Sequence, residues 1–202
     1  MKLRGLTICF LGPDGSGKST IIEGLLKKDL PFSQHKYFHL KPFPQMPTSK
    51  MQVVTDPHKY EPYSSLKSYF KLLFLFYQYN IGWASNILPL RGKSLLVVFD
   101  RYYDDLLVDY KRYRYGGKIC IAKLVKYFIP KPDLYFVLTT DANVIYKRKQ
   151  EVPLKELERQ INGYRNLIDG KRYFNIDVNK TSKEIVLEIS NIIVSKIQDV
   201  SD

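Results

Sequence analysis

Short apolar runs alternate along this chain with longer segments in which apolar side chains recur every three or four positions. Apolar runs of roughly four to eight residues indicate buried strands, whereas the longer spacing indicates helices that pack along one side. The pattern predicts five strands, at about 6–12, 36–40, 94–100, 133–140 and 173–177. It predicts helices at about 19–29, 64–88, 104–129, 142–169 and 181–197. Strands separated by helices indicate a parallel sheet with helices on both faces.

Glycine and proline interrupt this pattern at three places. Gly116 and Gly117 interrupt the predicted helix over 104–129, and Pro153 interrupts the one over 142–169. Prolines are dense over residues 42–62, which excludes regular structure there. We expect an ordered surface loop over this stretch.

The segment FLGPDGSGKST, at residues 10–20, contains the spacing G-x-x-x-x-G-K-[ST] of a phosphate-binding loop. Glycines let successive backbone N–H groups point into one concavity around anionic oxygens, and the following helix adds its positive N-terminal end. Lys18 is expected to reach the outer phosphates, and the Ser19 hydroxyl is expected to bind Mg²⁺. A glycine-rich turn with a chance lysine is the alternative, but the flanking strand and helix favour the phosphate site. The residues predicted to hold the nucleotide are Gly12, Pro13, Asp14, Gly15, Ser16, Gly17, Lys18, Ser19 and Thr20.

A second informative cluster follows the third predicted strand, which ends in Asp100 and is followed by Arg101. Because ligands in such sheets bind at the carboxyl ends of the strands, Asp100 is expected beside the phosphate loop, where it can hold Mg²⁺ directly or through water. Arg101 is expected to clamp an acceptor phosphate with its bidentate guanidinium. An exposed Asp-Arg turn is the alternative, and the phosphate loop favours the site.

Basic residues gather where the helical stretch after the fourth strand is interrupted. They are Lys147, Arg148, Lys149 and Arg159. A mobile segment of this kind can close over phosphates, neutralise charge that develops in the transition state and exclude water. A charged, exposed helix is the alternative. The position favours a lid over about 142–160.

Composition and length favour a single domain that spans residues 1–202, since 45% of the residues are hydrophobic. Cys9 and Cys120 form neither a metal-spaced pair nor a disulfide framework, which fits a reducing compartment. No signal pattern precedes the first predicted strand. The longest apolar segment, YFKLLFLFYQYNIGW, falls short of the roughly 18–20 apolar residues that span a bilayer. We therefore expect a cytoplasmic protein without a membrane span.

The formal net charge of +12 is high for this length. It is compatible with nucleic acid, with acidic lipid, or with a site that handles several phosphates at once. The stretch DYKRYRYGGK mixes tyrosine with lysine and arginine, as a nucleic-acid surface does. A helix end whose basic residues line a phosphate-rich cleft accounts for it more simply, because phosphates are already expected nearby.

Three segments taken together, GPDGSGKST, FDRYYDD and KPDLYFVLTTDANVIYKRKQE, resemble the thymidylate kinase branch of the nucleoside monophosphate kinases. The resemblance implies a three-layer α/β/α P-loop fold with a five-stranded parallel sheet of order 2-3-1-4-5 and a helical lid. It implies Mg²⁺-dependent transfer of the γ-phosphoryl group of ATP to a monophosphate. No protein general base is then required, because the attacking group is already an anionic phosphate.

The resemblance also implies roles for individual residues. Asp14 would face the acceptor sugar, Arg101 would hold the acceptor phosphate, and Asp100 would serve the Mg²⁺. Lys18 would act on the donor phosphates and Arg148 would act from the lid. Catalysis would consist of positioning and charge neutralisation.

The acceptor half departs from the family pattern. Lys41 stands where an arginine is usual after the second strand, and Tyr79 falls near the position of the arginine that reads the thymine base. Asp104 and Asp105 replace the usual polar residues beyond the Asp-Arg-Tyr step, whose Tyr102 is predicted to contact the acceptor together with Lys41 and Tyr79. The donor half is therefore retained, while the acceptor is left open.

The leading hypothesis is a kinase that phosphorylates a small phosphorylated acceptor, most simply a nucleoside monophosphate. A second hypothesis keeps the donor but changes the acceptor to a sugar or another non-nucleotide alcohol, for which Asp14, Asp104 or Asp105 would be the base. An aromatic-rich predicted helix also motivates it, with Tyr69, Phe70, Phe74, Phe76, Tyr77, Tyr79 and Trp83. The third and most distant hypothesis is a nucleotide-dependent protein on nucleic acid or a membrane. The resemblance further makes a homodimer through the long helix possible.

Overall fold

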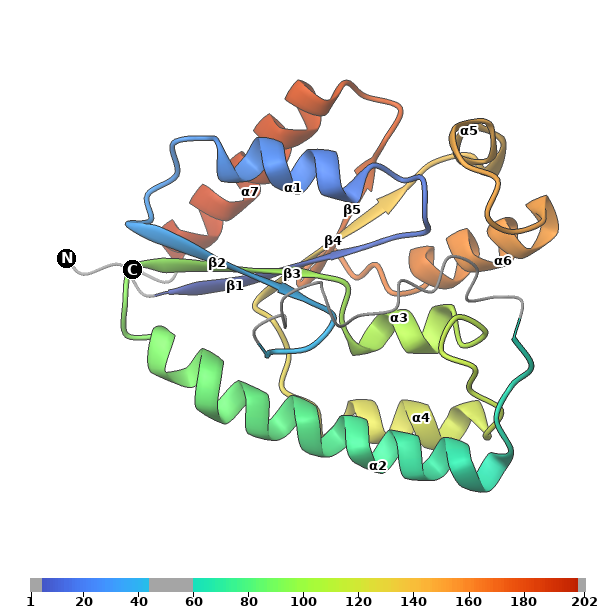
Figure 1. The fold of residues 1–202 in the computed structure, drawn as a ribbon. Coiled ribbons are helices and arrows are strands. Elements are labelled where there is room, and N and C mark those ends of the chain that lie inside the picture. The colour runs from blue at the N-terminus through green and yellow to red at the C-terminus, as the bar shows by residue number, and fades with distance from the viewer. Residues whose placement is uncertain (1–4, 44–59, 200–202) are drawn as a thin grey trace, which may run out of the picture.

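The computed structural model describes residues 5–43 and 60–199, and these form a five-stranded sheet with helices on both faces (Figure 1). The strands are β1 (Leu6–Leu11), β2 (Gln34–His39), β3 (Leu95–Asp100), β4 (Leu134–Thr139) and β5 (Tyr173–Asp177). Their order is β2-β3-β1-β4-β5, and every neighbouring pair is parallel. The predicted fold class and strand order are therefore confirmed.

The position of each strand in the sheet explains its sequence. Strands β1, β3 and β4 are buried along their whole length, so they read as nearly unbroken apolar runs. Strand β2 lies at an edge and exposes every side chain except Phe38. The more polar sequence QHKYFH is what an edge strand tolerates.

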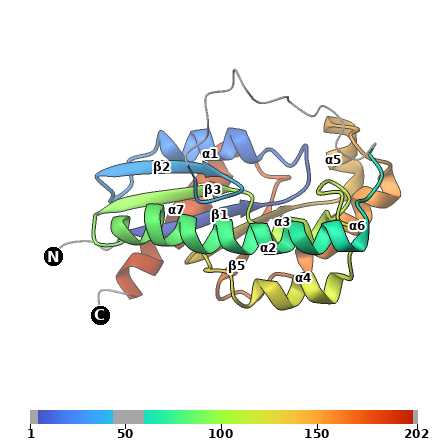
Figure 2. The ribbon, with the colours of Figure 1, turned by 60° about the horizontal axis from the view of Figure 1, so that its bottom comes forward.

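Two layers of helices cover the sheet. Helices α1 (Lys18–Leu26) and α7 (Ser182–Asp199) lie against one face, while α2 (Ser65–Gly82), α3 (Tyr103–Val108) and α4 (Ile119–Lys126) lie on the other (Figures 1 and 2). The core under α1 and α7 is mainly aliphatic. The core on the opposite face is rich in aromatic side chains, which pack edge to face and in stacks beneath the carboxyl edge of the sheet.

Helices α5 (Ala142–Arg148) and α6 (Leu154–Arg165) follow β4 and project from the carboxyl edge of the sheet (Figure 1). The break between them falls at residues 149–153, next to the predicted interruption at Pro153. Helical structure in the segment expected to form a lid is confirmed, and its closure stays a prediction.

The predicted break at Gly116 and Gly117 within the helical stretch over 104–129 is confirmed, but the break begins earlier than predicted. Helix α3 ends at Val108, and the chain forms turns until α4 begins. These turns approach residues 60–63, where the Tyr63 backbone N–H donates to the Arg114 carbonyl at 2.8 Å. A Cβ atom on Gly116 would lie 2.1 Å from the Tyr63 carbonyl oxygen, so this approach requires glycine. Tertiary pairing thus overrides local helical propensity.

The predicted helix over 64–88 is regular only as far as Gly82. It continues as a π-helical turn, η3 (Trp83–Ile87), and a short 3₁₀ turn, η4 (Leu88–Leu90), where Pro89 disfavours further α-helix. A Cβ atom on Gly82 would lie 2.9 Å from the carbonyl oxygen of Pro42. Helix α2 can therefore approach the segment after β2 closely. Most of the predicted proline-rich loop, residues 44–59, lies outside the described residues.

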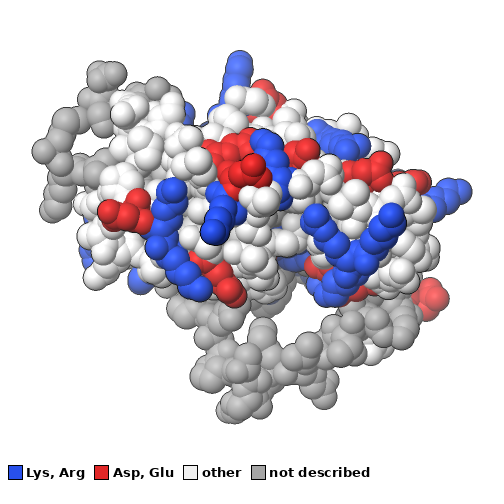
Figure 3. Space-filling view, turned by 90° about the horizontal axis from the view of Figure 1, so that it is seen from above, with Lys and Arg blue, Asp and Glu red and all other residues white. Residues whose placement is uncertain are grey.

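Within the described ranges, no helix combines the length and apolarity needed to cross a membrane. The face that carries α1 and α7 shows acidic and basic side chains side by side (Figure 3).

Candidate functional site

The phosphate-binding loop joins β1 to α1 at the carboxyl edge of the sheet. Gly12, Gly15 and Gly17 have φ values of 147°, 83° and 85°, a region that favours glycine. A Cβ atom on Gly12 would lie 2.6 Å from the Leu138 carbonyl oxygen, because β4 runs directly beside the loop. The loop conformation expected from the glycine spacing is thus required by backbone contacts with the neighbouring strand.

Lys18 lies at the first position of α1 and folds back over the loop. Its ammonium group donates to the carbonyl oxygens of Gly12 at 2.7 Å and Pro13 at 2.9 Å. Burial of Lys18, together with the charge of Arg101, lowers the pKa of the Lys18 ammonium to about 8. The charges of Asp14, Asp100 and Asp105 oppose this lowering, and bound donor phosphates would favour the charged ammonium further. Ser19 and Thr20, which follow Lys18 on α1, are exposed and accessible to a ligand.

The lowered pKa of Lys18 makes polyphosphate binding sensitive to alkaline pH. Above pH 8 the ammonium of the free protein loses its proton, and a bound polyphosphate must restore it. We expect the association constant for inorganic tripolyphosphate to fall with rising pH above 8, with a limiting slope of about tenfold per pH unit. Isothermal titration in buffers of different ionisation enthalpy should also show proton uptake near pH 8. An affinity that stays flat from pH 7 to 9 would contradict this assignment, and Lys18→Ala should abolish the proton uptake.

Asp14, inside the loop, is held by two arginines that are distant in sequence. Arg101 and Arg112 both donate to its carboxylate, one to each oxygen. Burial favours the neutral form of Asp14, but the charge of Arg101, a hydrogen bond with Glu151 and the charges of Lys18 and Arg112 outweigh it and lower the pKa. Asp14 is therefore an ionised anchor that ties the donor loop to the residues after β3.

Arg101 bridges this loop and a buried carboxylate. Its guanidinium donates to both oxygens of Asp105 at 2.8 Å, and Asp105 is completely buried. Tyr113 and Tyr164 donate to the same carboxylate, Tyr113 at 2.8 Å. Arg101 has a φ of 69°, which is uncommon for a residue other than glycine and concentrates at functional sites. The predicted phosphate clamp is thus oriented from behind by Asp105.

Asp104, the neighbour of Asp105 on α3, is also buried in the interior. Lys126 forms an ion pair with it at 2.5 Å, and the Tyr173 hydroxyl donates to it at 3.1 Å. Only 1% of Asp104 is exposed. Both acidic residues that replace the family's usual polar positions are therefore used in internal pairs.

Asp100 ends β3 and retains an unused oxygen. The Tyr37 hydroxyl donates to Oδ2 at 3.1 Å, and the Nδ1 atom of His39 lies 3.8 Å from the same oxygen. Burial would raise the pKa of Asp100, but the hydrogen bond with His39 and the charges of Lys18 and Arg101 lower it. The buried Oδ1 atom has no hydrogen-bond partner among the described residues.

The donor set at this edge fits Mg²⁺. Asp100 offers an ionised carboxylate with a free oxygen, and Ser19 offers an exposed hydroxyl. Mg²⁺ is commonly held by one or two carboxylates together with substrate phosphates and water, so a dedicated protein cage is not needed. No group of three histidine, cysteine, aspartate or glutamate residues that could enclose a metal occurs in the described ranges.

The predicted acceptor residue Tyr79 contacts the segment after β2, next to the predicted acceptor residue Lys41. The Tyr79 hydroxyl, which is buried, donates to the Leu40 carbonyl at 2.7 Å, and Leu40 itself has a φ of 63°. Asn86 also reaches this segment and donates to the Pro42 carbonyl at 3.0 Å. Tyr79 is therefore placed to position Lys41, and its contact with an acceptor stays a prediction.

Tyr79 gives a direct test of this positioning role. Tyr79→Phe removes one buried hydroxyl and leaves the Leu40 carbonyl without its donor, which should cost about 1–3 kcal/mol of unfolding free energy. Urea denaturation measures the loss. Tyr127→Phe is the matched control, because Tyr127 is 77% exposed and should change little. Equal effects of the two substitutions would contradict the role assigned to Tyr79.

Tyr102 also belongs to the interior. Only 1% of it is exposed, and its hydroxyl donates to the Pro130 carbonyl at 2.7 Å. The ring packs edge to face against Tyr79, with centroids 4.8 Å apart. The predicted contact between Tyr102 and an acceptor remains untested, whereas its packing role under the site is direct.

Further cations surround this side of the site. The Lys71 ammonium donates to the Tyr113 carbonyl at 2.5 Å and lies 5.3 Å from the centre of the Tyr63 ring. Arg114 stacks on the same ring at 4.2 Å. Burial lowers the pKa of Lys71, and the charges of Lys41 and Arg114 lower it further. Cations gathered in this way favour an anionic ligand nearby.

The segment between α5 and α6 lies against the phosphate-binding loop. A Cβ atom on Gly15 would lie 2.9 Å from the Cβ atom of Lys149, and the Lys149 ammonium pairs with Glu151 at 2.5 Å. The hydrogen bond between Glu151 and Asp14 raises the pKa of Glu151. Arg148 is exposed and donates to the Val178 carbonyl at 3.0 Å, so its described contact is with the end of β5.

The structure brings most of the predicted residues to one edge of the sheet and adds two that the sequence analysis did not assign. Arg112 and Glu151 both contact Asp14. Arg112 lies 98 residues away along the chain, so no local spacing could have indicated the pair. Arg159, predicted as part of the basic lid cluster, instead donates to Glu156 and to the Val108 carbonyl.

Comparisons with known proteins place this chain among the thymidylate kinases. A family model for thymidylate kinase matches residues 10–189. A curated thymidylate kinase of Bacillus cereus (strain Q1) is 22% identical over 218 residues, which cover 96% of this chain and 100% of that protein.

Solved structures of thymidylate kinases share the fold. That of Candida albicans aligns with a TM-score of 0.65 and 20% identity over 97% of this chain and 94% of its own. That of Ehrlichia chaffeensis aligns with a TM-score of 0.59 and 18% identity over 93% and 97%. With the family model spanning the phosphate-binding loop, the Asp-Arg step and the α5–α6 segment, the chain belongs to the thymidylate kinase family and is a nucleoside monophosphate kinase-like phosphotransferase.

Proposed function

We propose that this protein transfers the γ-phosphoryl group of ATP, with Mg²⁺, to a small phosphorylated acceptor, most simply a nucleoside monophosphate. The observation that carries the proposal is the position of Arg101. It is buried, fixed from behind by Asp105, and tied to the phosphate-binding loop through Asp14. A guanidinium held in this way can bind an acceptor phosphate beside the donor phosphates.

The chain supplies positioning and positive charge. The loop N–H groups and Lys18 would bind the donor phosphates, while Arg101 would orient the acceptor phosphate for attack. Arg112 contacts Asp14 from the other side and would reinforce this alignment. The acceptor oxygen is already anionic, so no side chain needs to remove a proton from it.

Asp100 and Ser19 are the residues that would hold Mg²⁺. When bound, the ion neutralises charge on the donor phosphates. The segment between α5 and α6 would act as the lid, because it already contacts Gly15 and Asp14. Arg148, at the end of α5, would then contribute charge from the lid, as the family resemblance implies. We further propose that these parts belong to one P-loop kinase domain located in the cytoplasm.

The acceptor is identified by a screen coupled to ADP release. Purified protein with Mg²⁺-ATP should convert at least one member of a nucleoside monophosphate panel to its diphosphate, and Lys18→Ala serves as the blank. The panel should be wide, because the thymidylate kinase of Candida albicans is described as having broad substrate specificity. If no nucleoside monophosphate is converted while ATP is still bound, the nucleotide acceptor is excluded.

A sugar or another non-nucleotide alcohol is the second candidate acceptor, and the same screen should include such compounds. Such an acceptor needs a carboxylate base, and the three suggested bases differ in their surroundings. Asp104 and Asp105 are buried in internal pairs, so Asp14 is the one of the three suggested bases that lies in the loop. Asp14→Asn with unchanged turnover on an alcohol would exclude Asp14 as a base.

We also propose that two copies pair through α2. Six large apolar side chains are exposed along this helix, and their spacing places them on one stripe. They are Leu66, Phe70, Leu73, Phe74, Tyr77 and Ile81. An exposed apolar stripe of this size is typical of an interface. Sedimentation should show a dimer that Phe70→Glu converts to a monomer, whereas Leu187→Glu on α7 should not. A wild-type monomer would contradict the pairing.

A further inference from the structure

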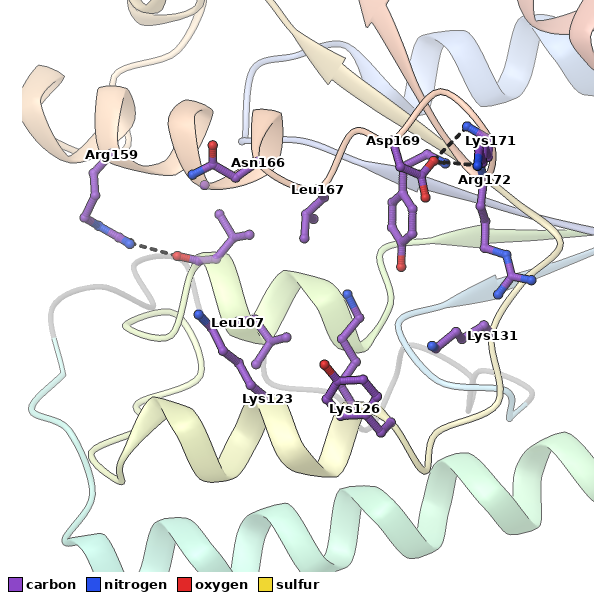
Figure 4. Close-up of a pocket in the computed structure, with 14 residues that line it drawn as sticks. Leu107, Lys123, Lys126, Lys131, Arg159, Asn166, Leu167, Asp169, Lys171 and Arg172 are labelled. Atoms are coloured by element: carbon purple, nitrogen blue, oxygen red, sulfur yellow. Dashed lines mark hydrogen bonds between the residues drawn. The ribbon is translucent and has the colours of Figure 1, made fainter.

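A cavity lies away from the phosphate-binding loop, between α4 and the segment formed by α6 and the turn before β5 (Figure 4). It has a volume of about 670 Å³, which is within the range of small-molecule sites. None of residues 12–20 lines it. It is therefore separate from the proposed donor site.

Six cationic side chains line this cavity, from both of its walls. They are Lys123, Lys126, Lys131, Arg159, Lys171 and Arg172. In Figure 4, Lys123 and Lys126 rise from α4, while Arg159 approaches from α6 and Arg172 from the turn. These six cations outnumber the three carboxylates near them, Asp104, Glu156 and Asp169, so the cavity keeps a net positive charge.

Few carboxylates compensate these charges. Lys126 pairs with Asp104 and Arg159 with Glu156. Within the described part of the chain, no carboxylate forms an ion pair with Lys123, Lys131 or Lys171. The cavity thus retains three lysines whose charge is available to a ligand.

Asp169 is the single acidic residue in the lining, and it forms hydrogen bonds within the turn before β5. Its Oδ1 atom accepts from the backbone N–H groups of Lys171 and Arg172 at 2.8 Å and of Tyr173 at 2.9 Å (Figure 4). These bonds lower the pKa of Asp169 against the opposing effect of burial. Asp169 therefore shapes the turn that carries two of the cations.

The cavity also has an apolar lining between the charges. Leu107 and Val108 from α3, Leu167 after α6, and the rings of Tyr127 and Tyr173 contribute to it. Cations around an apolar floor match a ligand that joins an organic, ring-containing body to several phosphates. A flat surface would suit a polymer backbone, whereas this concave shape suits a small molecule.

We propose that this cavity binds a small polyphosphorylated molecule with a ring-containing body, of the nucleoside triphosphate class, at a site distinct from the phosphate-binding loop. The proposal does not depend on which acceptor the enzyme phosphorylates. It assigns the cationic residues of α4 and of the 169–172 turn to ligand binding.

The test is the stoichiometry of ATP binding to the full-length chain, measured by equilibrium dialysis at fixed moderate salt. Wild-type protein should bind two ATP per chain, and Lys18→Ala should retain the second site. The triple variant Lys123→Ala/Lys131→Ala/Lys171→Ala should retain only the loop site, with the second affinity weakened at least tenfold. The triple variant Lys27→Ala/Lys36→Ala/Lys93→Ala is the charge-matched control, because these three lysines are exposed and lie outside the cavity. It should still bind two.

Three results would overturn the proposal. One is a single ATP per wild-type chain. Another is a second site that survives the cavity triple variant, which would assign the extra binding to the acceptor side. The third is a cavity that binds a single-stranded oligonucleotide but is not titrated by ATP, which would assign it to nucleic acid. Circular dichroism of the triple variant verifies that it is folded before the stoichiometry is compared.

Discussion

Replacing Arg101 by alanine is expected to abolish phosphoryl transfer and to destabilise the fold at the same time. Arg101 neutralises Asp105, which is completely buried, and Asp14, which borders the loop. Breaking a buried ion pair by removing one partner costs about 3–5 kcal/mol, because the other charge remains buried without compensation. Loss of a preorganised positive group at a phosphoryl-transfer site should reduce turnover by about 10²–10³-fold.

The two effects of Arg101→Ala can be separated with a second substitution. Arg101→Ala/Asp105→Asn removes the buried charge that the single variant leaves unpaired. Its unfolding free energy, measured by urea denaturation, should recover in part, while turnover in the ADP-release assay should stay low. A single variant as stable as the wild-type protein would contradict the structural role. Turnover restored in the double variant would contradict the role at the acceptor phosphate.

Replacing Lys18 by methionine is expected to remove activity without loss of stability. The ammonium is the donor-side charge of the site, and its removal should lower turnover by at least about 10²-fold. Its pKa is lowered to about 8, since burial disfavours the charged form. An apolar side chain of similar length removes this unfavourable burial, so the unfolding free energy should equal or exceed that of the wild-type protein. Function at this position thus opposes stability.

The effect of Lys18→Met on the unfolding free energy depends on pH, because folding lowers the pKa of Lys18. The folded pKa of Lys18, about 8, lies below the unfolded value of 10.5, so between these values the unfolded chain binds more protons. Wild-type stability therefore gains from rising pH in this window. The advantage of the methionine variant should be largest below pH 8 and should shrink towards pH 10.5. A variant that unfolds more easily than the wild-type protein at pH 7 would contradict the assignment.

The α/β fold and the donor loop could be predicted from the sequence because their signals are local. Buried parallel strands read as apolar runs, and the glycine spacing of residues 12–17 reflects backbone torsions that side chains other than glycine rarely adopt. The position of Asp100 followed from the same reasoning, since a strand ending at the carboxyl edge brings its last residue to the loop. These features depend on a few consecutive residues.

The acceptor side was decided by tertiary contacts. Asp14 is paired with Arg101 and Arg112 from 87 and 98 residues away, and no repeating pattern encodes such pairs. The Tyr79 hydroxyl donates to the Leu40 carbonyl and thereby fixes the segment of Lys41, a role that the sequence did not indicate. The contact of Tyr79 with an acceptor stays a prediction. The predicted helix over 104–129 was interrupted for a similar reason, because its middle pairs with residues 60–63.

The sequence by itself thus determined the succession of strands and helices, the phosphate-binding loop and the residues that reach the carboxyl edge. The order of the strands in the sheet was implied by the family resemblance. The tertiary structure alone decided which charges neutralise one another there and which tyrosines support the site from the core. It also decided where the cationic cavity between α4 and α6 forms. The physical reason is the separation along the chain between the residues that interact. Backbone torsions and apolar burial are set by neighbours in the sequence, whereas ion pairs and cavities arise between elements that meet only when the sheet and both helical layers are packed.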